Sequence, residues 1–235
     1  MTHRFSELDP APVASTICVL ARRIQERFPG SGLGEVATEL VKVADQNQAV
    51  IEHLRRPLWW LRVLAGLAIG ALIALSLWAA VQLTRIAKGG SESLADLLQG
   101  IDAATNEVIF LSLVVFFLVS LETRLKRRTA LRTLHRLRSI AHVVDMHQLT
   151  KDPEYALHPV EGTASSPVRT LTRTQLVRYL DYCSELLALT SKLAALHAQR
   201  LQDPVVLDAV NDIESLTSDL SRKIWQKITI LDSVR

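Results

Sequence analysis

Residues 63–84 read VLAGLAIGALIALSLWAAVQLT, a run of 22 residues without a charged side chain. An α-helix rises 1.5 Å per residue, so this run would be roughly 33 Å long, enough to cross a hydrocarbon core of about 30 Å. Trp59 and Trp60 come just before it, where amphipathic rings favour the headgroup boundary. The run predicts a first transmembrane helix over residues 58–87.

A second apolar run, VIFLSLVVFFLVSL, covers residues 108–121 and is shorter, roughly 21 Å as a helix. Starting the helix at residue 103 lengthens it to roughly 28 Å but includes Asn106 and Glu107, polar groups that should then face protein or water. We predict a second transmembrane helix over residues 103–122. A short external loop, residues 88–102, joins the two, with a brief helix at 94–99 that ends at Gly100.

The distribution of charge predicts the orientation of this hairpin. Basic residues flank it on the side of both chain ends: Arg55, Arg56, Arg62, Arg124, Lys126, Arg127, Arg128, Arg132, Arg136 and Arg138. Residues 88–107 between the spans instead carry a net charge of −3. The positive-inside rule therefore predicts cytoplasmic N- and C-termini, and in a bacterial cell the inner (plasma) membrane.

The basic residues nearest the spans have a second interpretation, as ligands of anionic lipid headgroups. This set contains Arg55, Arg56, Arg124, Lys126, Arg127 and Arg128. Nucleic acid is disfavoured as a partner, because no aromatic residue lies among the arginines after the second span. The lipid bilayer is the partner that the sequence predicts.

Outside the spans the hydrophobic pattern is helical, so the predicted fold class is all-α: a membrane hairpin with a cytoplasmic helical bundle. Residues 1–57 form N-terminal helices, the second of which keeps one register through Pro57 and is expected to be continuous with the first span. Residues 123–154 continue the second span, and residues 155–170 form a linker. Residues 171–235 form a helical hairpin that begins with a Thr172–Gln175 capping box, and Asp203 caps its second helix.

Asn47 occupies an apolar position in the pattern of the second helix. One interpretation is that it fixes the register of a parallel dimer of helices, since a buried Asn at such a position specifies register at a cost in stability. The other is that it meets a polar group or water within a bundle formed by one chain. The sequence leaves both open.

The sequence contains no recognisable catalytic or phosphate-binding motif, so we expect neither an enzyme nor a cofactor. His135 and His142 are nearly in line on a helix, with Asp145 one turn further on. They are weak candidates for a metal site or a pH sensor, and otherwise make ordinary polar contacts. Cys18 and Cys183 lie far apart in the sequence and are expected to be reduced, buried thiols.

The predicted spans contain two sets of residues that could serve assembly. Gly66, Gly70 and Ala74 form a small-xxx-small pattern that lets helices approach closely, within the hairpin or between subunits. Gln82, Asn106 and Glu107 lie near the outer boundary. In an oligomer Glu107 could form an acidic ring at a pore mouth; alternatively it caps its own helix.

The layout over roughly residues 36–150 resembles the SLATT-type two-transmembrane effectors of bacteria, and the C-terminal hairpin from Thr172 is an addition to that pattern. The resemblance implies a homo-oligomeric pore in a bacterial conflict system that a nucleotide triggers. We therefore expect a pore-like effector gated by its cytoplasmic helices, with a cytoplasmic protein or small molecule as its trigger. The alternative is a membrane-anchored scaffold whose C-terminal hairpin docks a partner protein.

Overall fold

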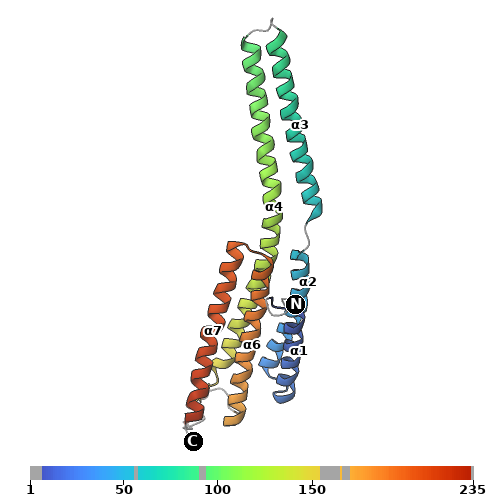
Figure 1. Ribbon diagram of the computed structural model, residues 1–235. Coiled ribbons are helices and arrows are strands. Elements are labelled where there is room, and N and C mark those ends of the chain that lie inside the picture. The colour runs from blue at the N-terminus through green and yellow to red at the C-terminus, as the bar shows by residue number, and fades with distance from the viewer. Residues whose placement is uncertain (1–6, 56–57, 90–93, 154–164, 166–169, 234–235) are drawn as a thin grey trace. The chain divides into compact units, whose positions relative to one another are not determined.

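The computed structural model describes residues 7–55, 58–89, 94–153, 165 and 170–233, and in these residues it is all-helical (Figure 1). The helices are α1 (Pro10–Arg27), α2 (Gly32–Arg55), α3 (Trp59–Gly89), α4 (Leu94–Leu149), α6 (Arg173–Arg200) and α7 (Pro204–Ser233). Arg56, His158 and nearly all of the predicted linker at 155–170 lie outside the described residues.

The chain divides into two compact units. Residues 56–126 form the hairpin of α3 and the first part of α4. Residues 1–55 and 127–235 form a helical bundle, which contains α1, α2, the remainder of α4, α6 and α7. α4 is one helix of 56 residues and contributes to both units.

In the bundle, α1 lies against α2 and α6. α6 packs on α2 and α7. α4 contacts both α2 and α7, because Arg136 forms an ion pair with Glu39 of α2 and Arg138 forms one with Asp212 of α7. Its buried positions Leu134, Leu137, Ala141 and Val144 enter the same core as the stripes of the other helices. The apolar faces predicted from the sequence are thus the faces that are buried.

Most helix ends in the structure lie where the capping residues of the sequence predict them. Thr172 and Gln175 form the predicted capping box, and the Oδ1 atom of Asp203 accepts hydrogen bonds from the backbone N–H groups of Val205 and Val206. α1 begins earlier than its apolar stripe, because Asp9 caps it and Pro10 fits the first turn. Gly30, at φ 69°, supplies the left-handed residue that turns the chain towards α2.

Two predicted boundaries are wrong. α2 ends at Arg55 and α3 begins at Trp59, with Leu58 between them non-helical, so the two are not one continuous helix. Pro57 has no N–H to donate to a continuing helix. Gly100 does not end a short loop helix, because α4 continues through it from Leu94. A glycine costs a helix only about 1 kcal/mol, too little to stop one that is otherwise favourable.

The two cysteines differ in environment. Cys183 is buried, as expected, and burial raises the pKa of its thiol to about 12. Cys18 is exposed on α1, so the expectation that it is buried is wrong. The apolar positions of α1 recur at Val13, Ile17 and Leu20. Cys18 follows Ile17 directly and is therefore turned away from that stripe by about 100°.

Candidate functional site

Two helices are long and apolar enough to cross a membrane. The candidate spans are Trp59–Gln82 in α3 and Gly100–Leu149 in α4, and most side chains in their most apolar stretches are exposed. Large side chains such as Leu67 and Phe116 are about two-thirds exposed. A surface of this size and apolarity is typical of a site that contacts lipid or protein rather than water. The hairpin is therefore the candidate functional site.

The hydroxyl groups inside the apolar runs are satisfied by their own helices. Ser76 Oγ donates to the carbonyl oxygen of Leu72 at 2.8 Å, and Ser120 Oγ donates to that of Phe116 at 2.7 Å. An unsatisfied hydroxyl would be costly in hydrocarbon, so this local bonding makes both residues compatible with a lipid-facing position.

The small-residue stripe of α3 faces away from α4. The less exposed positions of α3 recur at Leu61, Ala65, Ala68, Leu72, Leu75 and Ala79. Gly66, Gly70 and Ala74 are exposed and lie on the opposite side of the helix. A Cβ atom added at either glycine would meet nothing within 4 Å outside its own helix. The stripe is thus not used within the hairpin, and its surface is open.

The polar residues near the connecting end of the hairpin do not share one environment. Asn106 and Glu107 are exposed on α4, whereas Gln82 is half-buried, on the same side of α3 as Leu75 and Ala79. Glu107 lies 13 residues after the start of α4 at Leu94. The favourable interaction of an acid with a helix N-terminus is confined to the first turn, so Glu107 does not cap α4.

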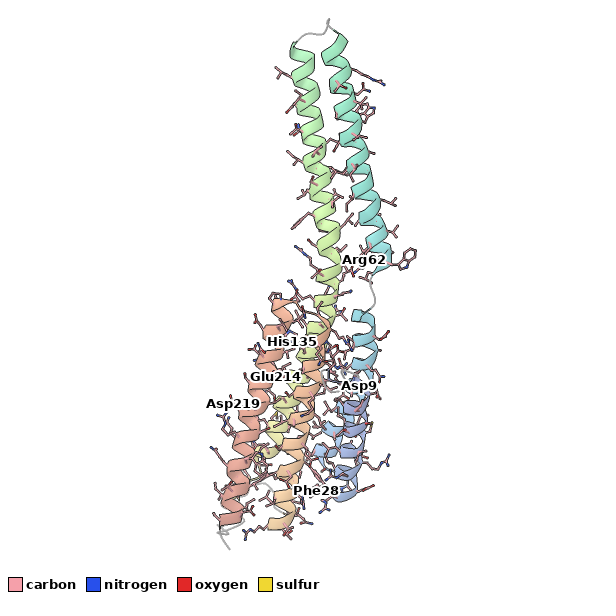
Figure 2. All side chains as sticks on the ribbon, viewed as in Figure 1. Asp9, Phe28, Arg62, His135, Glu214 and Asp219 are labelled. Carbon is pink, nitrogen blue, oxygen red and sulfur yellow. The ribbon has the colours of Figure 1, made fainter. Side chains whose placement is uncertain are left out.

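A cluster of charges closes the base of the hairpin around Glu122, which the sequence analysis did not single out. Its carboxylate accepts hydrogen bonds from Arg62 Nε at 3.2 Å and from the backbone N–H of Leu58 at 3.4 Å. Lys126 Nζ lies 2.9 Å from Oε1 of the same carboxylate. Figure 2 labels Arg62 near the start of α3. Glu122 is the only acidic residue between positions 108 and 144, and this was the available signal.

The basic residues predicted to meet lipid divide into two groups. Lys126 is paired with Glu122, and Arg127 donates from Nε and Nη2 to Asp203 Oδ2 at 2.9 and 2.6 Å. Asp203 is 4% exposed, so Arg127 neutralises a nearly buried carboxylate inside the bundle. Arg124 and Arg128 are exposed. Arg56 lies outside the described residues, as does the side chain of Arg55.

Asn47 has its polar partner within the same chain. This agrees with the interpretation that it meets a polar group within a bundle formed by one chain. It is fully buried, and its Oδ1 atom lies 2.5 Å from Nε2 of His197, which is also fully buried on α6. Its Nδ2 donates to the carbonyl oxygen of Leu193 at 3.4 Å, an orientation that makes Oδ1 the acceptor and Nε2 the donor. Burial lowers the pKa of His197 from 6.5 to about 4, so this imidazole is neutral at pH 7.

The histidines considered for metal binding do not form a ligand set. His135 and His142 are exposed on α4, and Asp145 accepts a hydrogen bond from Gln148 at 2.6 Å. Gln148 in turn accepts from Lys227 Nζ at 2.7 Å. Within the part of the chain that the structure describes, no three His, Cys, Asp or Glu side chains are grouped so that they could hold a metal ion.

Comparison with known proteins adds no relative: no family model, curated protein or solved structure matches the chain.

Proposed function

We propose that the chain is a two-pass protein of the bacterial inner membrane that assembles into a homo-oligomeric, ion-permeable pore, controlled by its cytoplasmic helical bundle. One hairpin has too few helices to enclose an aqueous path, so the function requires several copies. The observation that carries the proposal is the open face of α3, where Gly66 and Gly70 point away from α4. Small residues at such spacing allow close packing of transmembrane helices, here between subunits.

The polar outer end of α4 supports the same proposal. Asn106 and Glu107 are exposed, and Glu107 is not engaged in capping its helix. A polar or ionisable side chain at membrane depth is costly unless it faces protein or water. Repeated around an oligomer, Glu107 would form an acidic ring that attracts cations. This charge gives the pore a preference for cations over anions.

The N- and C-termini would then lie in the cytoplasm, together with the bundle. The charge asymmetry across the hairpin supports this orientation, since most of the basic residues flank the base, whereas residues 88–107 at the connecting end carry a net charge of −3. A trigger, either a protein or a small molecule, would bind the bundle, and a role in bacterial defence follows from the resemblance of the layout to two-transmembrane effectors.

The test combines oligomeric state with ion flux for the full chain in lipid. Gly70→Leu should block close approach along the stripe, and should lower both the oligomer fraction in nanodiscs and the flux through liposomes. Ala71→Leu is the matched control, because Ala71 is an exposed neighbour 100° further round the helix. A protein that remains monomeric at all lipid-to-protein ratios would overturn the proposal.

In a conducting protein, Glu107→Gln should reduce the preference for cations; unchanged selectivity would remove Glu107 from the mouth.

A membrane-anchored scaffold is the second candidate function. Exposed apolar side chains on the bundle favour it: Trp225 of α7 is 58% exposed, and Met146 of α4 is 66% exposed. Such residues are enriched at protein interfaces. A scaffold would leave a dye trapped inside liposomes whether or not it is oligomeric, and this outcome separates it from a pore.

A further inference from the structure

The seven basic residues that follow the second apolar run are not equivalent. Four are committed to carboxylates of the same chain, in the pairs Lys126–Glu122 (2.9 Å), Arg127–Asp203 (2.6 Å), Arg136–Glu39 (3.2 Å) and Arg138–Asp212 (3.9 Å). The other three are Arg124, Arg128 and Arg132. All three are exposed, and none forms an ion pair with another residue that the structure describes.

These three arginines, the arginine row, lie four residues apart along α4. Residues at this spacing occupy neighbouring positions on one side of a helix, so the row presents its charges along a single stripe about 12 Å long. Core positions such as Ala130, Leu134 and Leu137 are on another side of α4. The row is therefore a line of positive charge on the exposed side of the helix, without an ion-pair partner among the described residues.

The row begins directly after the apolar run. Arg124 is three residues beyond Leu121, Arg128 seven and Arg132 eleven, which correspond to about 4.5, 10 and 16 Å of helix. Each headgroup layer of a bilayer is roughly 5–7 Å thick. Side chains on a helix tilt towards its N-terminus, and the N-terminal direction of α4 is towards the apolar run. The arginine side chains therefore lean back towards the headgroups.

We propose that the arginine row is a binding site for anionic phospholipid headgroups of the leaflet at the base of the hairpin. Guanidinium groups bind phosphate oxygens through two parallel hydrogen bonds, and no carboxylate among the described residues forms an ion pair with the three arginines of the row. The contribution decreases from Arg124 to Arg132, because each step moves the charge about 6 Å further from the headgroups. The site rests on the proposed membrane insertion, but it does not require that the protein conducts ions.

The test is a lipid titration of the full chain purified in neutral detergent, with bound lipids counted by native mass spectrometry. The probes are phosphatidylglycerol and phosphatidylcholine with identical acyl chains. We expect the wild type to retain phosphatidylglycerol preferentially. Each basic residue near an anionic surface contributes about 1 kcal/mol, so Arg124→Gln with Arg128→Gln should weaken phosphatidylglycerol binding by roughly 30-fold. Binding of phosphatidylcholine should not change.

The matched control is Arg136→Gln with Arg138→Gln, which removes the same net charge from paired positions on the same helix. It should weaken phosphatidylglycerol binding by less than about threefold, since these charges are already neutralised. Equal losses for the two double variants would show attraction by net charge alone and would overturn the proposal. So would an effect of Arg132→Gln that equals or exceeds that of Arg128→Gln.

Extraction of cell membranes with alkaline carbonate separates failure of this proposal from failure of the proposed function. A chain that is released by carbonate is not inserted, and both proposals then fail. A chain that stays in the membrane pellet but shows no preference for phosphatidylglycerol contradicts the arginine row alone.

Discussion

Asn47 and His197 show how far a single residue can be interpreted from sequence. The apolar pattern of α2 predicts that Asn47 is buried, and this prediction is confirmed. Its partner His197 on α6 is fully buried as well. Their contact joins residues 150 positions apart, and no local signal could pair them. Periodicity specifies which face of a helix is buried, but it does not specify the side chain opposite.

Replacing Asn47 should therefore destabilise the bundle without changing the association between subunits. Asn47→Leu leaves the buried Nε2–H group of His197 without an acceptor, which should cost about 1–3 kcal/mol. Asn47→Leu combined with His197→Leu removes both polar groups and should recover much of this loss. The measurement is the thermal unfolding midpoint of the full chain in detergent. Tighter subunit association in Asn47→Leu would instead favour a register role between chains.

His197 should also make stability depend on pH. Its pKa is about 4 in the folded chain and 6.5 when unfolded, so the unfolded state binds more protons between these values. Stability from this group is complete above about pH 6.5 and decreases as the pH falls towards 4, by up to about 3 kcal/mol. The unfolding midpoint of the wild type should thus fall more steeply between pH 7 and 5 than that of the double variant. Parallel curves would contradict this assignment.

At the scale of the elements, capping signals located the helix starts at Arg173 and Pro204, because such signals are local. The predictions of a continuous helix through Pro57 and of a helix end at Gly100 were wrong, because local sequence signals do not determine whether the backbone breaks there. A hydrophobic register can continue across a break in the backbone, and a glycine acts as a stop only where the chain turns. The Glu122 contacts at the base of the hairpin depend on how α3 and α4 pair, which periodicity does not contain.

Asp203 combines two roles at the start of α7, and substitution can separate them. Asp203→Asn keeps an oxygen for the N–H groups of Val205 and Val206 but leaves the Arg127 guanidinium without its carboxylate. Asp203→Ala removes the cap as well, and should be less stable than Asp203→Asn by about 1 kcal/mol. Thermal unfolding midpoints of the two variants provide the comparison. Equal midpoints would mean that the cap contributes nothing measurable.

At the scale of the whole molecule, the sequence predicted an all-helical chain with two apolar helices, and the described residues confirm this class. The arrangement of α2, α4, α6 and α7 in the bundle could not be predicted from the sequence, because four amphipathic helices can pack together in several pairings. Charged pairs such as Arg138–Asp212 belong to one of these pairings only, and neither residue is distinctive in the sequence.

The two cysteines provide a test of the proposed orientation without new labelling sites. A membrane-impermeant maleimide should leave Cys18 unmodified in intact spheroplasts and should modify it once the membrane is permeabilised. Cys183 should react only after unfolding, because it is fully buried and its pKa is raised to about 12. Mass spectrometry measures the modification, and Cys18→Ser assigns it. Labelling of Cys18 in intact spheroplasts would place α1 outside the cell.

The division of the bundle between residues 1–55 and 127–235 has a consequence during synthesis. At about 5–20 residues per second, a ribosome needs roughly 8–30 s to advance from Asn47 to His197. During that interval α1 and α2 have left the ribosome without α6, and the apolar hairpin is made before the bundle can close. The nascent N-terminal helices therefore expose an unfilled apolar face, and an interruption of translation would leave them prone to aggregation or to degradation.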